Sequence, residues 1–269
     1  NTAVGVCALL TTTTSGNNAA FGFCALKTTS TDCNAAFGSN ALRDQTTGGC
    51  NTAVGSSAGL RTTSGDENTA VGKSALFANT TGGQNTALGA LALDANTTGS
   101  QNVGLGNETL GTNTTGATNV AVGFAALNAN TTASANTAIG HRSLQANTTA
   151  ANNTAIGFCS LSANTTASAN TAVGTNALKT TTTGAENTAV GVGVLDVNTG
   201  SYNTAMGVDA GGSNTSGTGN VFMGNASGGA NTTANNNTAI GKDSLTTNTT
   251  GTFHASLGAC SLLSNTTGT

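Results

Sequence analysis

The amino-acid sequence predicts an all-β fold, a parallel β-solenoid (β-roll) of sixteen turns with mostly seventeen residues per turn. The first observation is a five-residue block, Asn-Thr-Ala-Val-Gly, which begins the chain at residues 1–5 and returns at residues 51–55. The second is its spacing, because successive glycines of the block are almost always seventeen residues apart. A fixed period of this length with a strand-like core is typical of a solenoid, in which each turn needs neighbours to bury its apolar face.

The repeat extends over the whole chain when its positions are numbered from the leading Asn. Thirteen repeats have seventeen residues, and those that begin at Asn18, Asn187 and His254 have sixteen. No composition shift, charge run or non-repeating stretch offers a boundary, so residues 1–269 are expected to form a single continuous domain. The repeats begin at Asn1, Asn18, Asn34, Asn51, Asn68, Asn85, Asn102, Asn119, Asn136, Asn153, Asn170, Asn187, Asn203, Asn220, Asn237 and His254.

Three positions of the repeat predict its corner and its core. Position five is Gly in every repeat, which indicates a backbone with positive φ or a close approach of another segment. Position four is always apolar, and we expect this row, which includes Val122, to point inward. Position nine is predominantly Leu and is expected to be the second core row. Gly211 and Gly228 interrupt it in consecutive repeats, and Phe222 is expected to fill part of that gap.

The remaining positions predict the strands and the outer surface. Positions seven and ten accept charged residues such as Arg142 and Asp94, so they are assigned to a solvated face. One strand is therefore expected near positions two to four and a second near positions eight to fourteen. Position three is Ala in thirteen repeats. This restriction suggests that the outer side is also packed, either against another copy of the chain, the preferred interpretation, or against the other sheet of a very thin roll.

Composition argues against several classes of function. Charged residues make up 6% of the chain, and the seven Lys and Arg are scattered, so nucleic acid is not predicted as a partner. No apolar run approaches the ~20 residues of a membrane helix, so membrane insertion is not predicted either. The first residues lack the pattern of a signal peptide, which suggests a mature or excised segment.

An enzyme is not predicted from this set of side chains. His141 and His254 lie seven repeats apart, which at ~4.8 Å per turn exceeds 30 Å, so no triad or metal cluster can use both. Asp66 and Glu67 are the only adjacent acidic pair and are expected in a charged loop. Fragments such as Gly104-Leu105-Gly106 are repeat corners, because no helix follows them as a phosphate loop requires. No cofactor and no metal site are predicted.

Position twelve carries a second chemical pattern. It is Asn in eleven repeats, ten of which have the Asn-x-Ser/Thr form of a glycosylation site. A stacked Asn ladder beside a Thr-rich strand would produce the same sequence pattern, so glycosylation and a structural ladder both remain open. The ten candidate sites are Asn79, Asn96, Asn113, Asn130, Asn147, Asn164, Asn214, Asn231, Asn248 and Asn265.

The six cysteines fall on two positions of the repeat. Cys7, Cys24, Cys159 and Cys260 occupy position seven, whereas Cys33 and Cys50 each end a repeat. Residues at the same position in adjacent turns lie ~4.8 Å apart, within the range of a disulfide. Cys7–Cys24 and Cys33–Cys50 are therefore allowed pairs, and inert thiols are the alternative. If subunits stacked head to tail, from Thr269 to Asn1, Cys260 of one copy would lie one turn from Cys7 of the next.

The block at Asn136-Thr-Ala-Ile-Gly140 resembles the β-roll head repeats of trimeric autotransporter adhesins and similar repeats of phage and viral tail fibres. The resemblance covers all sixteen repeats, although the seventeen-residue spacing is longer than in common adhesin heads. It implies a left-handed β-roll, often a trimer, in a rigid surface-exposed shaft or head.

We therefore expect a non-enzymatic, extracellular or surface-exposed structural fibre, filament or adhesin shaft, a glycoprotein if the sequons are used. Its expected partners are copies of itself, as a head-to-tail filament or a lateral trimer, and glycans or a host surface. The alternative is an ice-binding β-solenoid, because Thr recurs at positions two, thirteen and fourteen.

Overall fold

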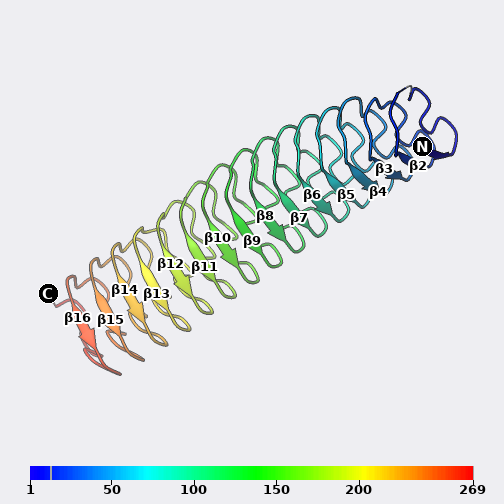
Figure 1. The fold of residues 1–269 in the computed structure, drawn as a ribbon. Coiled ribbons are helices and arrows are strands. Elements are labelled where there is room, and N and C mark those ends of the chain that lie inside the picture. The colour runs from blue at the N-terminus through cyan, green and yellow to red at the C-terminus, as the bar shows by residue number, and fades with distance from the viewer. Residues whose placement is uncertain (13, 269) are drawn as a thin grey trace. The chain divides into compact units, whose positions relative to one another are not determined.

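The computed structural model describes residues 1–12 and 14–268, and these residues form strands and turns without any helix (Figure 1). The chain divides into two compact units, residues 1–135 and 136–269. Each unit contains eight repeats, and each repeat contributes one three-residue strand at positions two to four. The last repeat ends at Thr269, so the stacking of subunits predicted from that end falls outside the described residues.

Within each unit every strand pairs in parallel with the strand of the next repeat, without a shift in register. Thr69, Ala70 and Val71, for example, lie opposite Thr86, Ala87 and Leu88. The first unit holds β1 (Thr2–Val4), β2 (Ala19–Phe21), β3 (Ala35–Phe37), β4 (Thr52–Val54), β5 (Thr69–Val71), β6 (Thr86–Leu88), β7 (Val103–Leu105) and β8 (Val120–Val122). The second holds β9 (Thr137–Ile139), β10 (Thr154–Ile156), β11 (Thr171–Val173), β12 (Thr188–Val190), β13 (Thr204–Met206), β14 (Val221–Met223), β15 (Thr238–Ile240) and β16 (Ala255–Leu257). The predicted parallel β-solenoid is confirmed.

The second strand predicted near positions eight to fourteen does not form in the described residues. Positions seven and nine adopt positive φ in each repeat, as at Ser74 (φ 54°) and Leu76 (φ 53°), and this alternation bends the chain out of an extended conformation. Neighbouring repeats are still joined by backbone hydrogen bonds in this segment. For example, the Leu76 N–H donates to the Ala92 carbonyl at 2.9 Å. The segment is therefore a stack of bonded turns.

The predicted orientation of the strand side chains is wrong. Position three points into the roll, and the Ala side chains there are buried, as at Ala121 and Ala138. Position four points outward, so that Val122 is half-buried and Ile139 keeps 37% of its surface exposed. The physical reason is the narrow interior, in which a row of small Ala side chains lies opposite the bulky Leu row. The alternative of a very thin roll accounts for the restriction at position three.

The second core row at position nine is confirmed, since Leu127 and its equivalents in the interior of each unit are fully buried. Phe222 occupies position three of its repeat and is also fully buried. Its ring fills the space that Gly211 and Gly228 leave, because a Cβ on either glycine would lie 2.3–2.6 Å from the ring. One large side chain on the strand therefore compensates for two leucines missing from the opposite row.

The glycine at position five meets both conditions predicted for it. Gly72 has φ +132°, and a Cβ built on it would lie 2.5 Å from the carbonyl oxygen of Gly89. The backbones of successive corners are thus too close for any side chain. This corner ends the strand and turns the chain toward the Leu row.

Candidate interaction surface

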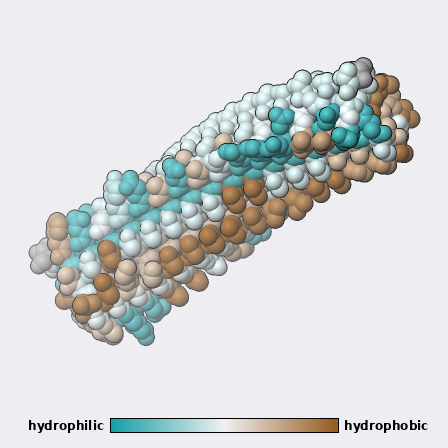
Figure 2. All heavy atoms as spheres, in the orientation of Figure 1, coloured by the Kyte–Doolittle hydropathy of each residue, from teal (hydrophilic) through white to brown (hydrophobic). Residues whose placement is uncertain are grey.

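An apolar row lies on the outer face of the strands. Position four of every repeat contributes Val, Ile, Leu, Phe or Met, and Figure 2 shows a brown band of such side chains. Leu88 keeps 44% of its surface exposed and Met206 keeps 49%. This row, which we call the outer row, exists because positions two and four share one face of the strand while position three faces inward.

Position six adds apolar side chains beside the outer row in some repeats. Phe158 and Val192 are each about half exposed. Rings also stack between neighbouring repeats, with centroids 4.9 Å apart for Phe21 and Phe37 and 5.2 Å apart for His141 and Phe158. On the other side of the row, position two presents Thr in ten of the sixteen repeats, for example Thr154. The surface is therefore a strip of hydroxyl, aliphatic and aromatic side chains.

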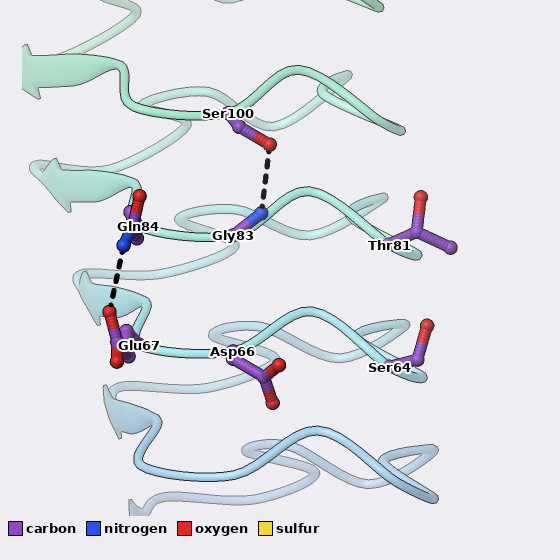
Figure 3. A pocket seen from close by; sticks show the side chains of 7 residues that line it. All are labelled: Ser64, Asp66, Glu67, Thr81, Gly83, Gln84 and Ser100. Atoms are coloured by element: carbon purple, nitrogen blue, oxygen red, sulfur yellow. Dashed lines mark hydrogen bonds between the residues drawn. The ribbon is translucent and has the colours of Figure 1, made fainter.

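A polar groove of about 250 Å³ lies on a different part of the first unit. Figure 3 shows Asp66, Glu67, Gln84 and Ser100 along its wall. The Glu67 carboxylate accepts a hydrogen bond from Gln84 Nε2 at 3.0 Å. Asp66 Oδ1 accepts one from the Gly49 N–H at 2.7 Å. Both carboxylates therefore bond to neighbouring repeats, and the groove pairs no nucleophile with a base.

The groove also displays an alternation at position sixteen of the repeat, the position before the last. Gly83 and Ser100 illustrate it, since the Gly83 N–H donates to Ser100 Oγ at 3.1 Å (Figure 3). In the first fourteen repeats every second repeat carries a side chain whose oxygen accepts a hydrogen bond from the N–H of the preceding repeat. Thr218 is the one N–H partner that also carries a hydroxyl, and the last two repeats, with Thr252 and Gly268, do not follow the pattern. The pairs are Gly16–Asp32, Gly49–Asp66, Gly83–Ser100, Ala117–Ser134, Ala151–Ser168, Ala185–Ser201 and Thr218–Asn235.

The asparagines of position twelve form a ladder inside the roll. Asn96 Nδ2 donates to Asn79 Oδ1 at 2.9 Å and to the Gly99 carbonyl at 2.9 Å. Nine of the ten predicted sequon asparagines are fully buried, and Asn265 is half-buried. A sugar on Nδ2 would have to replace one of these hydrogen bonds in a filled interior, so the folded repeats do not present the sequons. Glycan attachment stays a prediction, which intact mass before and after enzymatic deglycosylation tests.

A second ladder is formed by the leading asparagines at position one. Asn220 is fully buried; its Nδ2 donates to Asn203 Oδ1 at 3.1 Å and to the Ala234 carbonyl at 2.9 Å. Its own Oδ1 accepts the N–H of Asn237 at 2.9 Å. Each Asn thus satisfies buried backbone groups of neighbouring repeats, which explains why this position is almost invariant.

We expect Asn220→Ala to lower the free energy of unfolding of the second unit by about 1–3 kcal/mol. The substitution leaves the Asn237 N–H without a partner inside the roll, whereas the Ala234 carbonyl keeps its second donor, Asn231 Nδ2 at 3.1 Å. The exposed Thr233, whose φ is not positive, provides the control, and Thr233→Ala should cost less than about 1 kcal/mol. Urea unfolding followed by circular dichroism measures both, and equal losses would contradict a structural role for the ladder.

The cysteines are all free in the structure. Cys24 is buried with 8% of its surface exposed, and Cys7 is half-buried. Cys33, Cys50 and Cys260 are exposed. The predicted Cys7–Cys24, Cys33–Cys50 and intermolecular Cys260–Cys7 disulfides remain predictions.

The two histidines occupy unrelated surroundings. The His141 ring stacks on the Phe158 ring. The backbone N–H of His254 donates to Asn237 Oδ1 at 2.9 Å, as the backbone N–H of an Asn does at position one of other repeats. In the part of the chain that the structure describes, no group of three or more His, Cys, Asp or Glu side chains could hold a metal ion. Within the described residues, no helix is long and apolar enough to cross a membrane.

Comparison with known proteins adds no relative, because no family model, curated protein or solved structure matches the chain. The resemblance to adhesin and tail-fibre repeats therefore remains an expectation from the sequence. The amino-acid sequence also carries a signal for the outer row, although hydrophobicity alone places these side chains in the core. This signal is the variation in size at position four, from Val to Phe and Met, which a narrow interior would not accept.

Proposed function

We propose that the chain is a non-enzymatic structural segment of an extracellular or surface-exposed fibre or shaft, and that it associates laterally with copies of itself through the outer row. The observation that carries this proposal is the exposure of an apolar side chain at position four of consecutive strands. The two Asn ladders support a structural role as well, because their buried side-chain amides are used in hydrogen bonds that join neighbouring repeats.

The dimensions of the outer row support association. Eight strands spaced ~4.8 Å apart give a row of roughly 34 Å in each unit. With a width of about 10 Å it covers several hundred Å², which is the size of the largest apolar patch on a typical monomer, a patch that is often functional. Parallel strands in register also present a repetitive surface within each unit. A second copy with the same row could cover it, in a dimer or in the trimer that the resemblance implies.

We expect charged substitutions in the outer row to abolish self-association without unfolding the chain. Leu88→Lys with Ile156→Lys places one charge on an exposed position of the row in each unit, where it opposes burial between copies. The control, Thr98→Lys with Thr166→Lys, places the same charges on exposed residues outside the row. Sedimentation velocity should show oligomers for the unmodified chain and the control, and monomers for the row variant. A monomeric unmodified chain at high concentration would refute the proposal.

A second candidate function is ice binding, favoured by the Thr side chains that flank the same row. Strands β9–β12 each read Thr-Ala-Ile or Thr-Ala-Val, with Thr and the aliphatic residue on the outer face. They form an array with ~4.8 Å between strands and ~6.7 Å between positions two and four. Phe21, Phe37 and Met206 interrupt a flat surface elsewhere, so this candidate ranks second.

An ice recrystallisation assay separates the two functions. Inhibition at micromolar concentration, lost in Thr171→Lys and kept in the control Thr166→Lys, would favour ice binding. A monomer without inhibition would contradict both functions.

A further inference from the structure

The cysteine pair at the end of the second and third repeats is the one pair in adjacent repeats whose two side chains are both exposed. Cys33 and Cys50 occupy the last position of adjacent repeats and share a left-handed backbone, with φ 63° and 57°. Both side chains are exposed. The Cys50 N–H donates to the Asp32 carbonyl at 3.3 Å, which fixes the two residues side by side in the stack. Equivalent residues of neighbouring repeats are ~4.8 Å apart, within the 4.4–6.8 Å Cα range of a disulfide.

We propose that Cys33 and Cys50 are an oxidation site that closes to a disulfide on contact with a small disulfide oxidant such as oxidised glutathione. One protein thiolate attacks a sulfur of oxidised glutathione and releases one glutathione thiolate. The second protein thiolate then attacks the protein sulfur of this mixed disulfide and releases the other. Two protein thiols are oxidised, two electrons reduce the oxidant to two glutathiones, and the disulfide links repeats two and three.

The pair Cys7–Cys24 has the same one-repeat separation and serves as an internal comparison. Cys24 keeps only 8% of its surface exposed, and Cys7 is half-buried. Attack on a soluble disulfide requires an accessible thiolate, so this pair should react more slowly. Cys159 and Cys260 have no cysteine in a neighbouring repeat and cannot close within the chain.

The surroundings of Cys50 give the reaction a pH dependence. Its pKa is raised, first by loss of water beside the neighbouring turns, then by the Cys33 thiol and by the carboxylates of Glu67 and Asp66. A raised pKa lowers the fraction of thiolate at neutral pH, so the closure rate should increase as the pH rises toward and through that pKa. Glu67→Gln removes one negative charge and should increase the rate at a fixed neutral pH.

Peptide mapping tests the site because the few Lys and Arg separate the cysteines. The folded chain is incubated with oxidised glutathione, remaining thiols are blocked with iodoacetamide, and the protein is unfolded and cleaved with trypsin without reduction. Cys33 lies in peptide 28–43, Cys50 in peptide 44–61, and Cys7 with Cys24 in peptide 1–27. We expect a linked species of 28–43 and 44–61 that separates on reduction.

The variants make the result specific. Cys33→Ser should abolish the linked species, and the control Cys159→Ser should leave its yield unchanged. Recovery of 28–43 and 44–61 as separate blocked peptides would overturn the proposal. So would faster closure within peptide 1–27, because it would show that exposure does not select the reacting pair.

Discussion

Ala121→Asp should destabilise the first unit by at least about 4 kcal/mol, whereas Val122→Asp, one residue later, should cost less than about 1 kcal/mol. Ala121 is fully buried and faces the Leu row, so a carboxylate there has neither water nor a partner. Val122 lies on the outer face and is half-buried, so a carboxylate at its position reaches solvent. Leu127→Asp, at the opposite core row, should behave like Ala121→Asp.

Urea unfolding of these three variants, followed by circular dichroism, measures the difference. Ala121 and Val122 are adjacent in one strand and receive the same substitution, so a difference in unfolding free energy reports which side chain faces the interior. A larger loss for Val122→Asp than for Ala121→Asp would restore the orientation expected from the sequence and would remove the outer row as an interaction surface.

Gly38→Ala should cost the first unit several kcal/mol, although it adds a single methyl group. Gly38 has φ +139°, a region essentially restricted to glycine, and its new Cβ would lie 2.5 Å from the Gly55 carbonyl oxygen. Neither the strained backbone nor the contact can be relieved without moving two corners of the stack. We therefore expect a loss of about 3–5 kcal/mol, the range of severe single substitutions.

Gly49→Ala in the same repeat is the matched control. Its nearest contact would be the Asp32 carbonyl oxygen at 3.6 Å, an ordinary van der Waals distance, and its φ is not positive. The substitution should be neutral or stabilise by up to about 1 kcal/mol, because Ala restricts the unfolded chain. Similar midpoints of urea unfolding for the two variants would contradict a steric role for the position-five corner.

The period of the chain was enough to predict the fold, because a repeated sequence forces equivalent residues into equivalent environments. Gly72 and Leu127 show this. The corner role of position five and the core role of position nine were predicted because Gly and Leu recur at these positions along the chain. The second strand could not be predicted in the same way. A leucine with positive φ, such as Leu76, is uncommon, and residue preference alone assigns such an apolar segment to an extended strand.

The surface was harder to predict than the core, because alternation in a strand defines two faces without saying which is inside. Val122 seemed the better core residue by hydrophobicity, yet the available volume favours Ala121. The informative difference was constancy: position three is almost always Ala, while position four ranges from Val to Phe. In a narrow roll, constant size marks the inner face and variable size marks the outer one.

Because of the alternation at position sixteen, a pair of repeats is the smallest segment that preserves this side-chain hydrogen bond along the first fourteen repeats. Gly83 relies on the side chain of Ser100, whereas Ala117, two repeats after Gly83, offers no side-chain acceptor. Loss of one repeat, residues 85–101, would place Gly83 beside Ala117 and leave its N–H without a side-chain partner. Loss of residues 85–118 would place it beside Ser134 and restore the pattern. Deletion of two repeats therefore keeps the side-chain hydrogen bond of Gly83, whereas deletion of one repeat removes it.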